Sequence, residues 1–143
     1  YRMGGVFLDF DFECLQPFDE LNHYFEFYSG MDYSHTAGLL NGLIGSKPGH
    51  PILRLCIDRI KSTPFSPHDS VMKILEKSGP IFFAHCFKEI VKKPDERIMV
   101  FPVSYFYPFP NYARGQKDRK QIKKWIRPES YCIHYWDFSW EKI

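Results

Sequence analysis

The stretch GGVFLDFDFECLQPFDEL, residues 4–21, decides how the rest of the chain is interpreted. Apolar residues open the segment 5–12 and alternate with aspartates over residues 8–12, and this period of two predicts a half-buried strand over 5–12. In such a strand Asp9 and Asp11 share one face, and Phe10 lies with its apolar neighbours on the other. Because two neighbouring carboxylates repel each other, a cation is expected between them.

The composition is that of one globular domain. The chain has 143 residues, of which 44% are hydrophobic, so residues 1–143 are predicted to form a single domain with a sizeable core. Aromatic residues make up 18%, which suits a β-rich core or a site that stacks on sugars or bases. The formal net charge of +2 argues against nucleic acid or an anionic membrane as the main partner.

The four cysteines (Cys14, Cys56, Cys86 and Cys132) have wide, irregular spacings and form no CxxC pair. This pattern argues against a zinc site or a dense disulfide framework and favours free or buried thiols in a reducing compartment. No apolar run approaches the ~20 residues of a membrane span, and membrane association is possible through parts of the protein outside this segment. Localisation stays open, because no targeting segment is present in the sequence.

Hydrophobic spacing and turn residues predict one α/β unit without repeats or linkers. Strands are expected over residues 5–12, 23–31, 39–44, 97–102 and the first part of 130–140, and helices over 16–21, 51–61, 70–77 and 81–91. The proline- and aromatic-rich segment 103–111 is expected to be irregular. The basic run 113–125 is predicted to be an exposed loop or short helix, with an acceptor- or membrane-facing surface as the functional alternative.

The Asp9-Phe10-Asp11 pair is a candidate for divalent-cation binding. Mg²⁺ and Mn²⁺ prefer carboxylate oxygens and keep coordination positions open for phosphate oxygens. An Asp-x-Asp pattern alone is a weak signal, because any solvated strand end can carry it. Two features strengthen it: Gly4 and Gly5 permit close backbone approach, and ligands gather beyond the carboxyl ends of strands in open α/β sheets.

A second candidate set lies near the other end of the chain, at His134, Ser139 and Trp140. A lone histidine in an apolar strand is more often a core residue than a ligand. Histidine is nevertheless the commonest nitrogen ligand of metals, and a serine hydroxyl and an indole N–H can both donate to phosphate oxygens. These residues could therefore complete a metal–diphosphate site that the two aspartates begin.

Four ordered blocks give the chain a family resemblance. The segment YRMGGVFLDFDFECLQPFDEL resembles the DXD-containing sugar-binding region of family 32 glycosyltransferases, a group of mannosyltransferases with bacterial and viral relatives. NGLIGSKPGHPIL resembles the family's Asn-containing segment, and EKSGPIFF its TGP-type block. IHYWDFSW resembles its terminal His-His-Trp-x-x-Ser-Trp, with Tyr135 in place of the second histidine. The resemblance covers essentially the whole chain.

The resemblance implies an α/β fold of the GT-A, Rossmann-like type and transfer of a sugar from a UDP- or GDP-sugar to a glycan or lipid-linked acceptor. It implies dependence on Mn²⁺ or Mg²⁺ and retention of anomeric configuration. Transferred onto this sequence, the family roles make Asp11 a direct metal ligand, Asp9 a catalytic contact to the ribose and the metal shell, and His134 a further ligand. Ser139 and Trp140 would hold the diphosphate, and Asn41 would face the sugar or acceptor.

Family members also carry an upstream half that forms the base pocket, and Tyr1 corresponds to a point just after it. We therefore expect the N-terminal part of the GT-A fold to be missing, and the chain alone to bind nucleotide sugar weakly and turn over little.

Two other functions remain alternatives. A metal-dependent phosphohydrolase also gathers aspartates and histidines, although it normally needs a second acidic cluster. A non-catalytic carbohydrate-binding module would use the aromatic residues and would need no metal.

Overall fold

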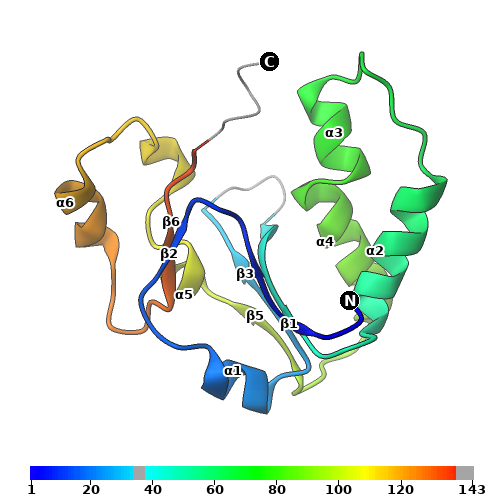
Figure 1. The fold of residues 1–143 in the computed structure, drawn as a ribbon, viewed down its shortest axis with the longest axis horizontal. Coiled ribbons are helices and arrows are strands. Elements are labelled where there is room, and N and C mark those ends of the chain that lie inside the picture. Colours follow the sequence, from blue (N-terminus) through cyan, green and yellow to red (C-terminus); the bar gives the residue numbers. More distant parts are fainter. Residues whose placement is uncertain (34–37, 138–143) are drawn as a thin grey trace.

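The central element of the computed structural model is a four-stranded mixed sheet with the order β1-β4-β3-β5 (Figure 1). The structure is described for residues 1–33 and 38–137. The strands are β1 (Gly5–Leu8), β3 (Phe27–Met31), β4 (Leu39–Ser46) and β5 (Ile98–Phe101). β4 runs antiparallel to β1 and β3, whereas β5 runs parallel to β3. The mixed sheet with its helices confirms the expected α/β class.

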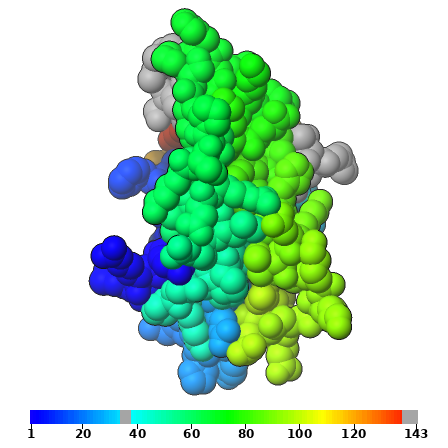
Figure 2. Space-filling model, turned by 90° about the vertical axis from the view of Figure 1, so that its right-hand side faces the viewer, coloured from blue at the N-terminus to red at the C-terminus, as the bar shows by residue number. Residues whose placement is uncertain are grey.

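The helices α2 (Pro51–Ser62) and α4 (Pro80–Ile90) cover one face of this sheet, and α3 (Val71–Lys77) packs against α4 (Figures 1 and 2). Proline begins α2 and α4, where its missing N–H costs no hydrogen bond, and the Ser70 hydroxyl accepts from the N–H of Lys73 to cap α3. Phe27 lies in the apolar layer between sheet and helices and is fully buried. No helix in the described part of the chain is long and apolar enough to cross a membrane.

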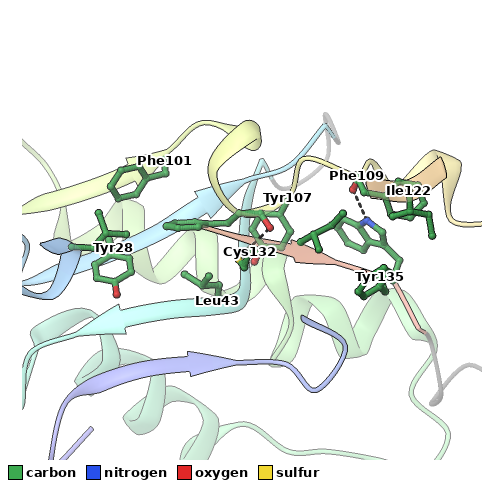
Figure 3. Packing of buried hydrophobic residues seen from close by; sticks show 12 residues of the cluster. Tyr28, Leu43, Phe101, Tyr107, Phe109, Ile122, Cys132 and Tyr135 are labelled. Carbon is green, nitrogen blue, oxygen red and sulfur yellow. Dashed lines mark hydrogen bonds between the residues drawn. The ribbon is translucent and has the colours of Figure 1, made fainter. Parts of the chain in front are cut away.

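An aromatic cluster covers the other face (Figure 3). Around it lie α1 (Asp19–Tyr24), α5 (Val103–Phe106), α6 (Arg119–Ile122), two short 3₁₀ turns at Asn111–Ala113 and Lys123–Trp125, and a two-stranded ribbon of β2 (Phe12–Cys14) and β6 (Cys132–His134). Strand alternation sends Tyr28 to this side and Phe27 to the helical side. A Cβ on Gly45 would lie 2.0 Å from the Tyr28 ring, so only glycine lets this ring pack against β4.

Most predicted elements are confirmed, with local corrections. Helices occur where they were expected after Pro51, over 70–77 and over 81–91, and the strands at 39–44 and 97–102 are present. The helix expected over 16–21 instead runs from Asp19 to Tyr24, and the predicted strand at 23–31 therefore begins only at Phe27. Segment 103–111 is not wholly irregular: its first four residues form α5, which ends before the prolines.

The expectation of one continuous strand over residues 5–12 is wrong. β1 ends at Leu8, and the N–H of Asp9 makes a last bond of 2.9 Å to the Gly42 carbonyl. The N–H of Phe12 then bonds back to the Asp9 carbonyl at 3.3 Å, which closes a turn and redirects the chain into β2. Phe10 is therefore fully exposed at this turn rather than packed on an apolar face.

Candidate metal centre

Asp9, Asp11 and His134 form a cluster at the junction of β1, β2 and β6. The turn after β1 carries the two aspartates, and His134 is the last residue of β6. One carboxylate oxygen from each aspartate and one imidazole nitrogen all lie within 4.8 Å of one another. The two aspartates near the beginning of the sequence and His134 near its end thus lie together, as was expected.

Asp11 is the most firmly held member. Its Oδ1 lies 2.9 Å from Nε2 of His134, and its Oδ2 accepts from the backbone N–H of Asp137 at 2.8 Å. The Asp11 carbonyl accepts from the N–H of Tyr135, which joins the turn to the end of β6. Burial acts to raise the pKa of Asp11, but the hydrogen bond and charge of His134, together with the Asp137 N–H, hold this pKa below its ordinary value.

Trp136 turns the chain so that the Asp137 N–H meets Asp11. Its φ is 57°, in the left-handed region that side chains other than glycine rarely adopt. The buried indole is anchored by a bond of 2.8 Å from Nε1 to the Phe109 carbonyl, which Figure 3 shows as a dashed line. The packing of the Trp136 indole and its hydrogen bond offset the strain of this backbone conformation. The strained residue directly precedes the N–H that positions the Asp11 carboxylate.

Asp9 is the open member of the cluster. Its side chain is exposed, yet partial desolvation and, to a smaller extent, the charge of Asp11 raise its pKa, while His134 acts in the opposite direction. A Cβ at Gly42 would lie 2.9 Å from Oδ2 of Asp9, so glycine at this position leaves room for the carboxylate. The two aspartates thus differ: Asp11 is held in its charged form, and Asp9 is the more easily protonated.

Aromatic rings fix the position of His134. The ring centroids of Phe12 and Trp136 lie 4.4 Å and 4.3 Å from that of His134, and Tyr107 packs edge-on at 5.7 Å. Because Asp11 is held as a carboxylate, we assign the imidazole proton to Nε2, which then donates to it. Nδ1 is buried and has no hydrogen-bond partner among the described residues.

The donor set fits a divalent cation with a preference for oxygen. Two carboxylates suit Mn²⁺ or Mg²⁺, and the imidazole favours Mn²⁺ of the two. Coordination through Nε2 would replace the contact of this atom with Asp11 Oδ1. The exposed side of Asp9 leaves the cluster accessible to a phosphate-bearing ligand.

The described part of the structure does not join the other predicted site residues to the cluster. Asn41 lies half-buried on β4, next to Gly42, and no side-chain hydrogen bond joins it to the described members of the cluster. Ser139 and Trp140 lie outside the described residues. In the basic run, Lys123 and Arg119 approach Glu13 at 2.6 Å and 3.9 Å, so part of this exposed segment is tied to β2.

Gly42, Trp136 and the Asp137 N–H were not predicted from the sequence to belong to the site. Gly42 leaves space for Asp9, and Trp136 positions a backbone donor toward Asp11. No residue type marks a backbone donor or an empty volume, so the only available signal was that Trp136 and Asp137 follow closely after His134.

The chain is similar in sequence to curated proteins that are named as glycosyltransferases. It is 27% identical over 95 residues to inositol phosphoceramide mannosyltransferase 3 of Schizosaccharomyces pombe, a match that covers 66% of this chain and 26% of that protein. Inositol phosphoceramide mannosyltransferase 1 of the same organism is 25% identical over 111 residues, which cover 78% of this chain and 34% of the relative.

A third relative is the uncharacterized glycosyltransferase L373 of Acanthamoeba polyphaga mimivirus, 28% identical over 109 residues, which cover 73% of this chain and 41% of the viral protein. The matches therefore span less than half the length of each of these relatives. No family model matches the chain, and no solved structure matches it.

Proposed function

We propose that the chain carries the metal and leaving-group side of a GT-A glycosyltransferase of the family 32 type. In this proposal the protein transfers a sugar from a UDP- or GDP-sugar to a glycan or lipid-linked acceptor, with retention of configuration. The names of two relatives, inositol phosphoceramide mannosyltransferases, favour a mannosyl donor and a glycolipid acceptor.

The cluster of Asp9, Asp11 and His134 is the single observation that carries the proposal. Departure of a nucleoside diphosphate develops negative charge on a phosphate oxygen. A bound Mn²⁺ or Mg²⁺ would neutralise that charge where it develops.

In this proposal, individual residues of the chain bind the cation, the ribose, the diphosphate and the sugar or acceptor. Asp11, fixed by the Asp137 N–H, and His134, fixed by its aromatic neighbours, would hold the cation. Asp9 would complete the shell and contact the ribose from its exposed side. Ser139 and Trp140 would donate to the diphosphate, and Asn41 would face the sugar or acceptor.

Titration with Mn²⁺, followed by the loss of the free-ion EPR signal, tests this proposal. We expect saturable binding by the chain, weakened at least about tenfold by Asp11→Asn and by His134→Gln. Asp58→Asn is a matched control, because Asp58 is an exposed carboxylate on α2 that pairs with Arg54. Equal binding by all four proteins would contradict the proposed site.

Assays of the complete protein separate the candidate functions. Sugar transfer from a nucleotide sugar that is lost in Asp11→Asn supports the glycosyltransferase. Metal-dependent release of phosphate from simple phosphoesters would support the hydrolase. Glycan binding unchanged by a chelator would support the binding module.

A further inference from the structure

Cys14 and Cys132 lie directly opposite each other on the ribbon that carries the candidate metal ligands. β2 and β6 are antiparallel, and their register pairs Cys14 with Cys132, Glu13 with Ile133 and Phe12 with His134. The pairing of the two strands therefore places side by side two cysteines that are far apart in the sequence.

The hydrogen-bond pattern shows which kind of pair the two cysteines form. The N–H of Leu15 bonds to the Tyr131 carbonyl at 2.8 Å, and the N–H of Tyr135 bonds to the Asp11 carbonyl at 2.9 Å. Hydrogen-bonded and non-hydrogen-bonded pairs alternate along an antiparallel ladder, so Cys14 and Cys132 form a non-hydrogen-bonded pair.

This position suits a covalent bond between the strands. Paired residues of this kind have Cα atoms about 4.5 Å apart, at the short end of the range that disulfides span. Their Cβ atoms project on the same side of the ribbon. We propose that Cys14 and Cys132 are a dithiol site that forms a reversible cross-strand disulfide.

The two thiols have complementary environments. Cys14 is exposed and can meet an oxidant. Cys132 is fully buried beside Tyr107, with its Sγ 3.5 Å from the Phe106 carbonyl (Figure 3). Because Cys132 is buried, it is shielded from solutes, and its position opposite Cys14 lets it reach a bond already made at the Cys14 sulfur.

A small-molecule disulfide such as oxidised glutathione can supply the oxidising equivalents. The Cys14 sulfur attacks it, forms a mixed disulfide and releases one glutathione thiolate. The Cys132 sulfur then attacks the Cys14 sulfur, forms the internal disulfide and releases the second glutathione. The two cysteine thiols lose two electrons and two protons, and both pass to the two glutathione molecules.

The bond would act on the metal-binding ribbon itself. It would join β2 to β6 next to the pair of Phe12 and His134. A disulfide that closes a long loop restricts the unfolded chain, so oxidation is expected to stabilise the fold and leave Mn²⁺ binding intact. Because Cys14 is exposed, a reducing thiol can reach the bond and open it again, which makes the site reversible.

The other two cysteines are an internal control. Cys56 on α2 and Cys86 on α4 are both buried, so neither offers an exposed thiol for the first attack. The double variant Cys56→Ala/Cys86→Ala therefore retains the proposed site.

The test treats the reduced chain with oxidised glutathione, blocks remaining thiols and maps disulfides by peptide mass spectrometry. We expect a Cys14–Cys132 cross-link in the wild-type chain and in the Cys56→Ala/Cys86→Ala variant. Oxidation should raise the wild-type Tm by about 5–10 °C, and dithiothreitol should reverse the rise. In Cys14→Ser, at an exposed position, the cross-link and the rise should both be lost.

Absence of the cross-link from folded wild-type chain, or an equal Tm rise in Cys14→Ser, would overturn the proposal. These readouts need no nucleotide sugar and no metal, so they are independent of the proposed glycosyltransferase function.

Discussion

His134 Nε2 lies 2.9 Å from Asp11 Oδ1, and this contact joins the two ends of the described chain at one site. Asp9 completes the group, but its environment differs from that of Asp11. Asp11 has a lowered pKa because His134 and the Asp137 N–H outweigh its burial, whereas the pKa of Asp9 is raised by partial desolvation and by Asp11. Replacing each carboxylate by a neutral amide is therefore expected to change the stability of the fold in opposite directions.

Without metal, Asp11→Asn should destabilise the fold, whereas Asp9→Asn should leave it unchanged or slightly more stable. Asp11→Asn removes the carboxylate that accepts hydrogen bonds from His134 and from the Asp137 N–H at a partly buried position, with an expected cost of about 1–2 kcal/mol. Asp9→Asn removes a partly desolvated charge and its weaker repulsion with Asp11, both screened by solvent at this exposed position, so a gain on the order of 0.5 kcal/mol or less is expected. Urea unfolding of the metal-free variants at pH 7 measures both, and equal destabilisation would contradict the assignment.

The pH dependence of Mn²⁺ affinity should reflect Asp9. A raised pKa means that Asp9 gains its proton before an ordinary aspartate as the pH falls, so affinity should begin to fall early on acidification. In Asp9→Asn the Mn²⁺ affinity should be lower at every pH. The early fall in affinity that protonation of Asp9 causes on acidification should be absent. Titrations from pH 7.5 downward check this, and identical pH profiles would count against the role of Asp9.

Without metal, Asp9 and Asp11 should make opposite contributions to the pH dependence of the free energy of unfolding. Asp11, with its lowered folded pKa, contributes stability that is present above the unfolded pKa and is lost as the pH falls through the folded pKa. Asp9, with its raised folded pKa, favours the fold at low pH and loses that contribution as the pH rises. Acid unfolding of Asp11→Asn should therefore be less steep than that of the wild-type chain, and that of Asp9→Asn steeper.

Gly42→Ala should weaken the metal site more than the fold. The new Cβ would lie 2.9 Å from Asp9 Oδ2, and the flexible carboxylate can move away at the expense of its ligand position. We expect Mn²⁺ affinity to fall on the order of tenfold with little change in Tm. Gly115→Ala is the control, because its new methyl group would have no atom beyond its chain neighbours within 4 Å. Unaltered affinity in Gly42→Ala would show that Asp9 is not held as we infer.

Phe10 and Phe12 should differ in their effect on stability. Phe12 packs on His134 with ring centroids 4.4 Å apart and on Tyr107 at 5.5 Å, so Phe12→Ala should cost about 2 kcal/mol. Phe10 is fully exposed, and Phe10→Ala should stay within about 0.5 kcal/mol. Thermal unfolding of the two variants makes the comparison, and a large cost for Phe10→Ala would mean that the turn packs differently.

Local sequence patterns predicted much of the fold. Pro51 marks the beginning of α2, because proline in the first turn loses no hydrogen bond, and α3 and α4 begin within one residue of their predicted starts at 70 and 81. A short apolar piece between glycines predicted β4, and the two aspartates and His134, which were candidate ligands in the sequence, lie together in the structure. These signals depend on neighbouring residues or on the chemistry of residue types, both of which can be read from the sequence.

The course of the chain at Asp9 depended on tertiary structure. Alternation alone continues the strand through Phe12, but β1 has its partner only as far as Leu8, and β2 pairs with β6 instead. The left-handed Trp136 and the space at Gly42 likewise follow from contacts between distant segments. The sequence by itself determined which residues could bind a cation, whereas strand pairing decided how they meet, because long-range hydrogen bonds and packing leave no local pattern.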